Sequence, residues 1–405
     1  MIGSVSLIKK LIIIICSILI SINVYAKDFN INSNYAILLE GDNVLYEKNS
    51  DTKVPIASLT KIMTALVVIE NAGDLNKAVT IKKSDFALVD SHDLATASLK
   101  EGETLTITDL LYGLMLPSGA DAAEALARSV VPNEKEFINL MNKTAEKLEL
   151  RNTHFSNPVG YDDSNNYSTA RDVSSLLNYA LENVIFKKIV TTDSYITTNK
   201  LHTYNSHIRK NALVGNYLEG GKTGTTNKAG LCLASFAYDK TTKLTLVTLG
   251  APLDYENKPQ YMDAKTLYSY YIDNYDKQRI VRTDEKVLSL SVSNSVNDYI
   301  DFYTLKDKYL YLPNDFNRSE LKYVYTGIKR LDPSFRKGEK LGHLTVLYKD
   351  EKIYSEDVYL EDNIKFSYIT YIKNNIKYLI IGIGLLLLSC MLVIKLVNKR
   401  VERRL

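Results

Sequence analysis

Apolar residues recur along the chain with two different periods, and these periods predict the order of its elements. NYAILLEGDNVLYEKN alternates apolar and polar residues around Gly41-Asp42-Asn43, which predicts two strands joined as a hairpin. SLTKIMTALVVIENA has helical spacing, as do 106–116, 121–130, 134–148 and 171–183. Two alternating strands around 239–242 and a helix at 260–275 follow. Strands that bracket a block of helices predict an α+β fold with an antiparallel sheet.

The pattern changes near Lys277. From 284 to 362, short β-type runs such as KVLSLSV, LKYVYTG and KIYSEDVYL are separated by turn residues. Such spacing is typical of a small all-β domain. We therefore expect a first domain over 27–276 and an all-β domain over 284–362.

Both ends of the chain are apolar, and their flanks distinguish them. Residues 1–26 combine Lys9-Lys10, an apolar run and the small residue Ala26, which is typical of a secretory signal peptide; an uncleaved anchor helix is the alternative. Residues 378–397 are almost uncharged and, at about 1.5 Å per helical residue, long enough to cross a bilayer. The basic tail 398–405 predicts a cytoplasmic C-terminus, so we expect a single-pass protein of the cell membrane with its body outside.

Composition narrows the functional classes. The 405 residues are 45% apolar and 24% charged, as in ordinary globular proteins. The formal net charge of +3 does not argue for nucleic acid as a partner. The sequence contains neither a Cys/His cluster nor a nucleotide-binding glycine motif, so we expect no metal and no cofactor. Only Cys232 lies in the expected exported body, where it can form no intramolecular disulfide.

Ser58-Leu59-Thr60-Lys61 is the first candidate for chemistry. Two side chains three residues apart share a helix face, so the hydroxyl and the amine can meet. A serine hydroxyl becomes a useful nucleophile when a neighbouring base removes its proton. The motif is weak alone, because Ser-x-x-Lys also begins at Ser6, Ser50, Ser319 and Ser334. Ser58 could equally be a helix N-cap.

Lys222-Thr223-Gly224, preceded by Gly220-Gly221, is the second candidate. We place it at the start of a strand, where glycines let a ligand come close and a strand edge can pair with an extended peptide. A lysine beside threonine hydroxyls can hold a carboxylate. A solvated turn is the alternative for this motif on its own.

The order of these motifs identifies a family. Ser58-x-x-Lys61, then Ser118, then Lys222-Thr223-Gly224 is the order found in penicillin-binding proteins and class A β-lactamases. The chain resembles the low-molecular-weight penicillin-binding proteins that act as serine-type D-Ala-D-Ala carboxypeptidases. The resemblance covers about 27–365 and includes VPIASLTKIMTALV, LLYGLMLPSGADAAEAL, YSTARD and LEGGKTGTTNKAGLCLAS. It implies a β-lactamase/transpeptidase-like domain, with an antiparallel sheet and a helical cluster, before the all-β domain.

The resemblance also implies roles for six residues. Ser58 would be the acylated nucleophile, Lys61 its general base, and Ser118 the proton relay to the leaving group. Lys222 would bind the substrate carboxylate together with Thr223 and Thr225, and the backbone N–H groups of Ser58 and Thr225 would form the oxyanion hole. Peptidoglycan stem peptides would be the substrate and β-lactam antibiotics covalent inhibitors. We also expect Lys222, as a like-charge neighbour, to lower the pKa of Lys61.

Ala120 departs from the family pattern, which has Asn between Ser118 and Asp121. The family's amide contacts the catalytic lysine and the substrate, and Ala can do neither. An alternative function is therefore a slow or inactive penicillin-binding regulatory protein. A β-lactamase is the nearest enzyme alternative, but NTHFSNPVGYDD offers no glutamate to drive deacylation. We expect Asp121 to serve the helix N-terminus.

Overall fold

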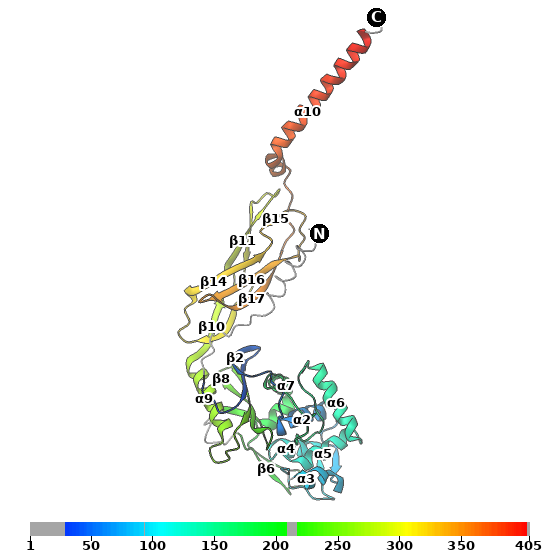
Figure 1. The fold of residues 1–405 in the computed structure, drawn as a ribbon, viewed down its shortest axis with the longest axis vertical. Helices are drawn as coiled ribbons and strands as arrows, with labels where there is room; N and C mark the ends of the chain where they lie inside the picture. Colours follow the sequence, from blue (N-terminus) through cyan, green and yellow to red (C-terminus); the bar gives the residue numbers. More distant parts are fainter. Residues whose placement is uncertain (1–28, 93, 209–216, 403–405) are drawn as a thin grey trace. The chain divides into compact units, whose positions relative to one another are not determined.

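The computed structural model describes residues 29–92, 94–208 and 217–402. The expected signal peptide, 1–26, lies outside the described residues. The chain forms two compact units, one ending at Asp276 and the other beginning at Lys277 (Figure 1). Each is described by itself below.

A five-stranded antiparallel sheet organises the first unit. Its order is β2-β1-β9-β8-β7. The strands are β1 (Tyr35–Glu40), β2 (Asn43–Lys48), β7 (Leu218–Thr226), β8 (Gly230–Asp239) and β9 (Thr242–Ala251). The predicted hairpin is confirmed: Glu40 pairs with Asn43, and Gly41 turns the chain with a φ of 57°. β7 ends the sheet, which leaves one of its edges free of strand partners within the described sheet.

Helices account for most of the remaining chain in this unit. They are η1 (Ala57–Leu59), α2 (Thr60–Asn71), η2 (Lys83–Phe86), α3 (Ala87–His92), α4 (Ile107–Met115), α5 (Ala120–Val130), α6 (Glu134–Lys147), α7 (Ala170–Glu182), α8 (Val184–Val190) and α9 (Pro259–Asn274). The long predicted helices are confirmed. The periodicity did not reveal α3, α8 or the two small strand pairs, β3 (Ala78–Thr80) with β4 (Thr104–Thr106) and β5 (Ser194–Ile196) with β6 (Thr203–Asn205), because each is too short to show a period.

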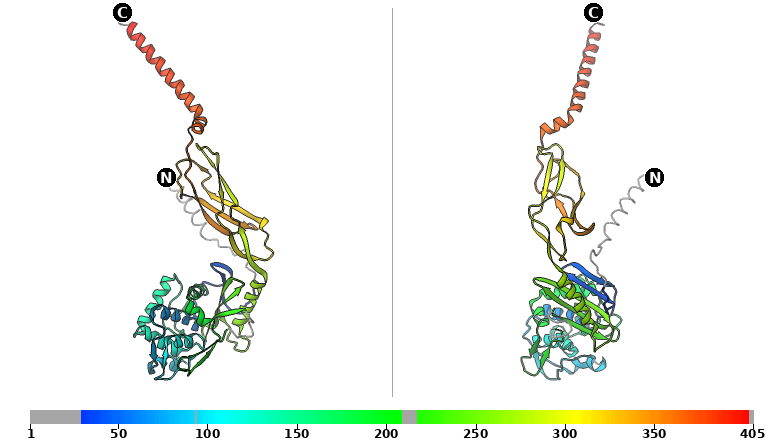
Figure 2. Two further views of the ribbon diagram at one scale, coloured as in Figure 1. Left: turned by 180° about the vertical axis from the view of Figure 1, so that it is seen from behind. Right: turned by 90° about the vertical axis from the view of Figure 1, so that its left-hand side faces the viewer.

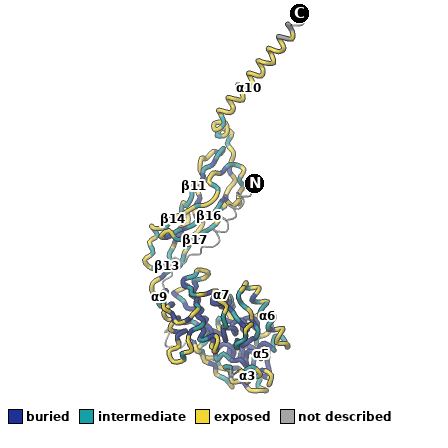
Figure 3. Tube along the Cα trace, viewed as in Figure 1, coloured by how far each residue is buried: buried dark blue, intermediate teal, exposed yellow. Residues whose placement is uncertain are grey.

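The sheet is covered by helices on both faces. Ser235 of β8 lies 3.1 Å from the Tyr268 hydroxyl of α9, whereas Thr245 of β9 donates to Asn178 of α7. Thr245 pairs with Phe236, the residue after Ser235, and successive strand residues point to opposite faces. The helices α7 and α9 therefore lie on opposite sides of the sheet, as two further views also show (Figure 2). Buried residues are concentrated in these layers (Figure 3).

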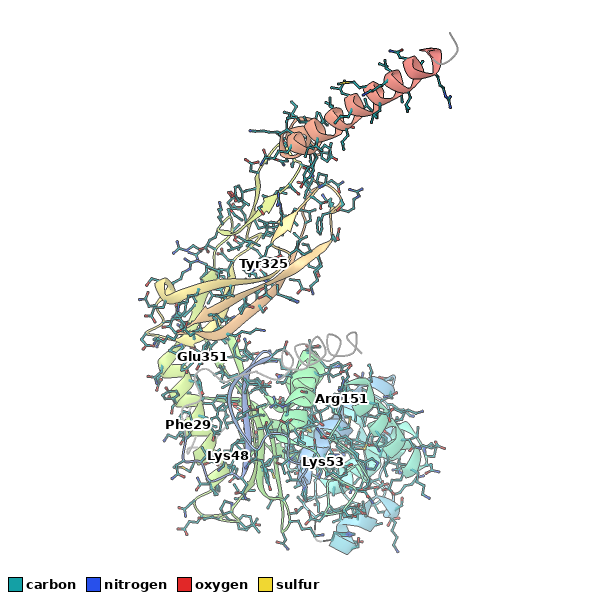
Figure 4. All side chains as sticks on the ribbon, turned by 45° about the horizontal axis from the view of Figure 1, so that its top comes forward. Phe29, Lys48, Lys53, Arg151, Tyr325 and Glu351 are labelled. Atoms are coloured by element: carbon teal, nitrogen blue, oxygen red, sulfur yellow. The ribbon has the colours of Figure 1, made fainter. Side chains whose placement is uncertain are left out.

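The second unit begins with an all-β domain. Its strands are β10 (Tyr275–Val281), β11 (Lys286–Val292), β12 (Tyr299–Tyr303), β13 (Lys308–Pro313), β14 (Leu321–Gly327), β15 (Arg330–Leu331), β16 (Lys340–Tyr348) and β17 (Glu351–Tyr359), with a short helix η3 (Arg318–Glu320). A small apolar core includes Leu290, Phe302 and Leu341. The Tyr325 hydroxyl lies 3.1 and 2.8 Å from the carbonyls of Ile328 and Leu341 (Figure 4). The predicted all-β character is confirmed.

The chain ends in one long helix, α10 (Tyr368–Glu402). Its stretch Tyr368–Asn398 is long and apolar enough to cross a membrane, and the most apolar part of this stretch is exposed. The predicted apolar segment 378–397 thus lies within a helix. The helix begins before that segment, at Tyr368, and no Pro or Gly interrupts it before Gly382.

Candidate active site

Ser58 lies at a strained point in the chain. It is the middle residue of η1, directly before α2, and the preceding Ala57 has a left-handed φ of 48°. Non-glycine residues adopt this conformation rarely, and such strain is concentrated at functional sites. The Ser58 side chain caps neither η1 nor α2. The alternative interpretation as an N-cap is therefore wrong, and the hydroxyl has a different partner.

That partner is Lys61. Its Nζ lies 3.0 Å from Ser58 Oγ and donates to the carbonyl oxygen of Val159 at 2.6 Å. The Lys61 side chain is buried, with 2% of the residue exposed. Burial disfavours the charged form and lowers the pKa of Lys61 to about 7. A large share of the amines is therefore neutral near pH 7, the state in which an amine can accept the proton of a serine.

The loop that carries Val159 is fixed from two sides. Asn157 Oδ1 accepts from the backbone N–H groups of Val159 and Gly160, and Thr64 of α2 donates to the Pro158 carbonyl. Gly160 has a φ of 85°, and a Cβ there would lie 2.1 Å from the Ala57 carbonyl oxygen. Only glycine lets this loop approach the strained residue before Ser58 so closely.

The strand β7 brings the second motif to Ser58. Lys222 lies within the strand, not at its start as predicted, because the strand begins at Leu218. A Cβ on Gly224 would lie 3.1 Å from Ser58 N, so the glycine permits close packing of β7 against the serine backbone. Lys222 and Gly224 are buried, whereas Thr223 is half-buried and Thr225 exposed. This alternation places the two threonines on one face of the strand.

The pKa of Lys61 is lowered as expected, but the expected cause, repulsion from Lys222, was wrong. Burial comes first among the causes that lower the pKa of Lys61, and the carboxylates of Asp121 and Glu124 oppose the shift. Repulsion between the lysines instead lowers the pKa of Lys222, which burial already depresses. Lys222 donates to the backbone carbonyl of Thr223 at 2.9 Å. The site therefore contains two buried amines that resist being charged together.

Ser118 stands in the turn between α4 and α5, both of which pack on α2. It has a left-handed φ of 67°, so a second candidate serine is also strained. Its side chain is half-buried and makes no hydrogen bond among the described residues. The next residue must be glycine, because a Cβ on Gly119 would lie 2.7 Å from the Ala97 Cβ. The turn thus presents an unengaged hydroxyl on a rigid support.

Asp121 and Ala120 fasten this turn to the preceding loop. The Asp121 carboxylate accepts from the N–H groups of Ala97 and Leu99 at 2.7 and 3.1 Å, and from that of Ala122. Its predicted place in the first turn of a helix is confirmed, with a loop contact that the sequence did not indicate. Ala120 is fully buried and donates from its backbone to Ala95. The sequence analysis did not identify Glu124, which lies one turn further along α5. The only indication in the sequence was the presence of an acidic residue in an alanine-rich helix.

The arrangement supplies the parts of a covalent hydrolytic site. A half-buried hydroxyl contacts a buried amine, a second hydroxyl stands on a strained turn, and a strand edge passes the serine backbone. A nucleophile next to its base is the signature of catalysis through an acyl-enzyme. The free edge of β7 can accept an extended peptide.

Comparisons with known proteins agree with this chemistry. Residues 22–253 match the peptidase S11 family, described as D-alanyl-D-alanine carboxypeptidase, and residues 275–365 match the C-terminal domain of penicillin-binding protein 5. The chain is 29% identical over 330 residues to the D-alanyl-D-alanine carboxypeptidase DacF of Bacillus subtilis, covering 79% of this chain and 82% of that protein. It is 37% identical over 203 residues to a D-alanyl-D-alanine carboxypeptidase of Streptomyces, covering 47% of this chain and 70% of that protein.

Solved structures give the same fold. Penicillin-binding protein 5 of Haemophilus influenzae superposes with a TM-score of 0.68 at 24% identity, over 84% of this chain and 99% of that one. The DD-transpeptidase of Streptomyces K15 superposes with a TM-score of 0.55 at 30% identity, over 61% of this chain and 98% of that one. The β-lactamase/transpeptidase-like fold predicted for the first unit is confirmed.

The Gly160 contact generates a test with a matched control. Gly160 and Gly102 have φ values of 85° and 86°, but a Cβ on Gly102 has no neighbour within 4 Å. Both Ala variants incur the left-handed penalty of about 1–2 kcal/mol. Gly160→Ala must also displace Ala57 and with it Ser58, so we expect labelling by a fluorescent penicillin to slow by roughly 100-fold. Equal labelling rates in the two variants would show that this contact does not position Ser58.

Proposed function

The chain belongs to the D-alanyl-D-alanine carboxypeptidase family of serine peptidases, and we propose that Ser58 is the nucleophile with which it removes the terminal D-Ala from peptidoglycan stem peptides. It is a serine-type D-Ala-D-Ala carboxypeptidase of the low-molecular-weight penicillin-binding protein class. The observation that carries the assignment of Ser58 is its 3.0 Å contact with the buried amine of Lys61.

Acylation begins with the transfer of a proton from Ser58 Oγ to neutral Lys61. The oxygen attacks the carbonyl carbon of the penultimate D-Ala, and the resulting oxyanion accepts from the backbone N–H groups of Ser58 and Thr225. The C–N bond then breaks. The proton returns from Lys61 through the Ser118 hydroxyl to the leaving amine of the terminal D-Ala. Water subsequently hydrolyses the ester, which frees Ser58 and the shortened peptide.

The strand β7 binds the substrate in this proposal. The terminal carboxylate of the stem peptide binds to Lys222, Thr223 and Thr225, while the peptide lies along the free strand edge. Burial lowers the pKa of Lys222, so a bound carboxylate would favour its charged form. The resulting ion pair would be stronger than an exposed one, because it lies out of water. β-Lactam antibiotics acylate Ser58 by the same attack, with opening of the lactam ring in place of release of an amine.

The cell membrane is the proposed location. Residues 1–26 direct export as a signal peptide, 27–276 form the catalytic domain outside the cytoplasm, and 284–362 form the all-β domain. The apolar helix within 378–397 anchors the protein in a single pass, and the basic residues of 398–405 remain in the cytoplasm. The long exposed apolar surface of α10 supports this arrangement.

The alternatives receive no support. None of the relatives or solved structures described above favours a regulatory penicillin-binding protein or a β-lactamase over a carboxypeptidase. Ala120 still lacks the amide that the family pattern supplies, so the rate of the reaction is the quantity to measure.

The assignment of Ser58 is tested by its removal. We expect the wild-type protein to gain the mass of one penicillin, and Ser58→Ala to gain none, because the acylated oxygen is absent. Intact-mass spectrometry measures both. An adduct of the same mass on Ser58→Ala would refute the assignment. With a D-Ala-D-Ala pentapeptide, wild type should release many equivalents of D-Ala; release of a single equivalent would favour the regulatory alternative.

The anchor is tested by shortening the chain. A protein that ends at residue 370 lacks the apolar segment 378–397 and should be secreted in soluble form, while it keeps its full rate of labelling by penicillin. Sedimentation of membranes after a salt wash, followed by detection of the labelled band, measures the distribution. If the shortened protein sediments with the membranes, another part of the chain is the main anchor.

A further inference from the structure

Glu124 is a half-buried acidic residue to which the mechanism above gives no role. It lies on α5, and its Oε1 is buried without a hydrogen-bond partner among the described residues. An unpaired carboxyl oxygen in an apolar environment destabilises the fold, more so when it is charged. A position with this cost calls for a functional explanation.

The groups around Glu124 determine the electrostatic environment of its carboxyl. The elements that pack against α5 include α2, η2, α3, α4 and α6. The titratable groups that interact with Glu124 are Lys61 of α2, Asp85 of η2, Glu134 of α6 and Tyr161 of the neighbouring loop. Four further titratable groups, on α5 and the elements around it, are engaged elsewhere. His92 of α3 stacks on Tyr161, Asp109 of α4 binds Thr106, Tyr195 and Thr198, Arg128 binds Asp85, and Asp121 binds the loop at 97–99.

Among the described groups named as the main influences on the pKa of Glu124, Lys61 is the one cation. The carboxyl also stands four residues after Ala120, on the same helix and the same face. Ala120 occupies the position where the family pattern has an amide that contacts the catalytic lysine. Glu124 thus supplies an electrostatic partner to Lys61 from one helical turn further along.

We propose that Glu124 is a positioning residue for the carboxypeptidase reaction, which acts through Lys61 by holding the proton of that base more tightly when the carboxyl is ionised. This inference rests on the proposed roles of Ser58 and Lys61. It extends them by naming a group that influences the pH at which Lys61 loses its proton.

The sign of the effect follows from the charges. Burial lowers the pKa of Lys61 to about 7, and ionised Glu124 opposes that shift. Burial, with repulsion from Glu134 and Asp85, raises the pKa of Glu124 to about 8, and Lys61 opposes that shift. As the pH rises through this range, ionisation of Glu124 makes Lys61 harder to deprotonate. Loss of the Lys61 proton is thereby spread over a wider pH range than a lone amine would show.

The test is the pH dependence of acylation by a fluorescent penicillin in Glu124→Gln, which keeps the shape of the side chain and removes its charge. We expect the midpoint of the rising limb to move to lower pH by about 0.5 unit, so that the rate at the wild-type midpoint rises about 1.5-fold. At low pH, where Glu124 is protonated, the two profiles should converge. The limb should also steepen to that of a single ionisation. Glu136→Gln, the same change at an exposed position of α6, is the matched control and should keep the wild-type profile.

A second variant tests the opposite sign and does not depend on the folding of the first. Glu134→Gln removes a repulsion from Glu124, favours its carboxylate, and should move the midpoint to higher pH. Profiles of both variants that superpose on wild type would overturn the proposal. Slower hydrolysis of the acyl-enzyme in Glu124→Gln, with an unchanged acylation profile, would also overturn it. A wild-type protein that penicillin does not label would instead refute the proposed function.

Discussion

The burial of one lysine amine is the constraint on which the site depends. Lys61 is enclosed by α2, by the loop at 157–160 and by α5, and its Nζ contacts Ser58 Oγ and the Val159 carbonyl. An amine in water holds its proton to about pH 10 and could not serve as a base at neutral pH. Enclosure removes that obstacle, because a charge in an apolar environment is costly. The fold therefore favours the neutral amine by excluding water from it.

The same enclosure requires unusual backbone around it. Ala57 and Ser118 adopt left-handed conformations. Gly160 lets its loop approach to a distance that a side chain would forbid, and Gly224 lets β7 pack tightly against the Ser58 backbone. Asn157, Thr64 and Asp121 fix these segments through backbone hydrogen bonds, which compensate for the strain. Three regions far apart in the sequence thus meet at Ser58. Their glycines and polar contacts are part of the site even where they touch no substrate.

Much of this could be predicted from the sequence, and the reasons for the rest are physical. The helix at 60–71, the hairpin at Gly41 and the β runs after residue 284 have clear periods, and the three motifs led to Ser58, Lys61 and Lys222. A period could not reveal α3 or α8, which are too short, nor the helical start at Tyr368, where composition is mixed. The motif could not show that burial, and not Lys222, is the main cause of the lowered pKa of Lys61, because burial depends on tertiary packing. For the same reason Glu124 was not recognised: an acidic residue in a helix is usually exposed.

The most direct test of this account is the rate at which penicillin acylates the wild-type protein as a function of pH. The account predicts a rate that rises with pH to a plateau, with a midpoint near 7, because only neutral Lys61 can take the proton of Ser58. Well below that midpoint the rate should fall about tenfold for each pH unit. A midpoint near the ordinary lysine value of about 10, or a rate that does not change between about pH 5 and 9, would contradict it.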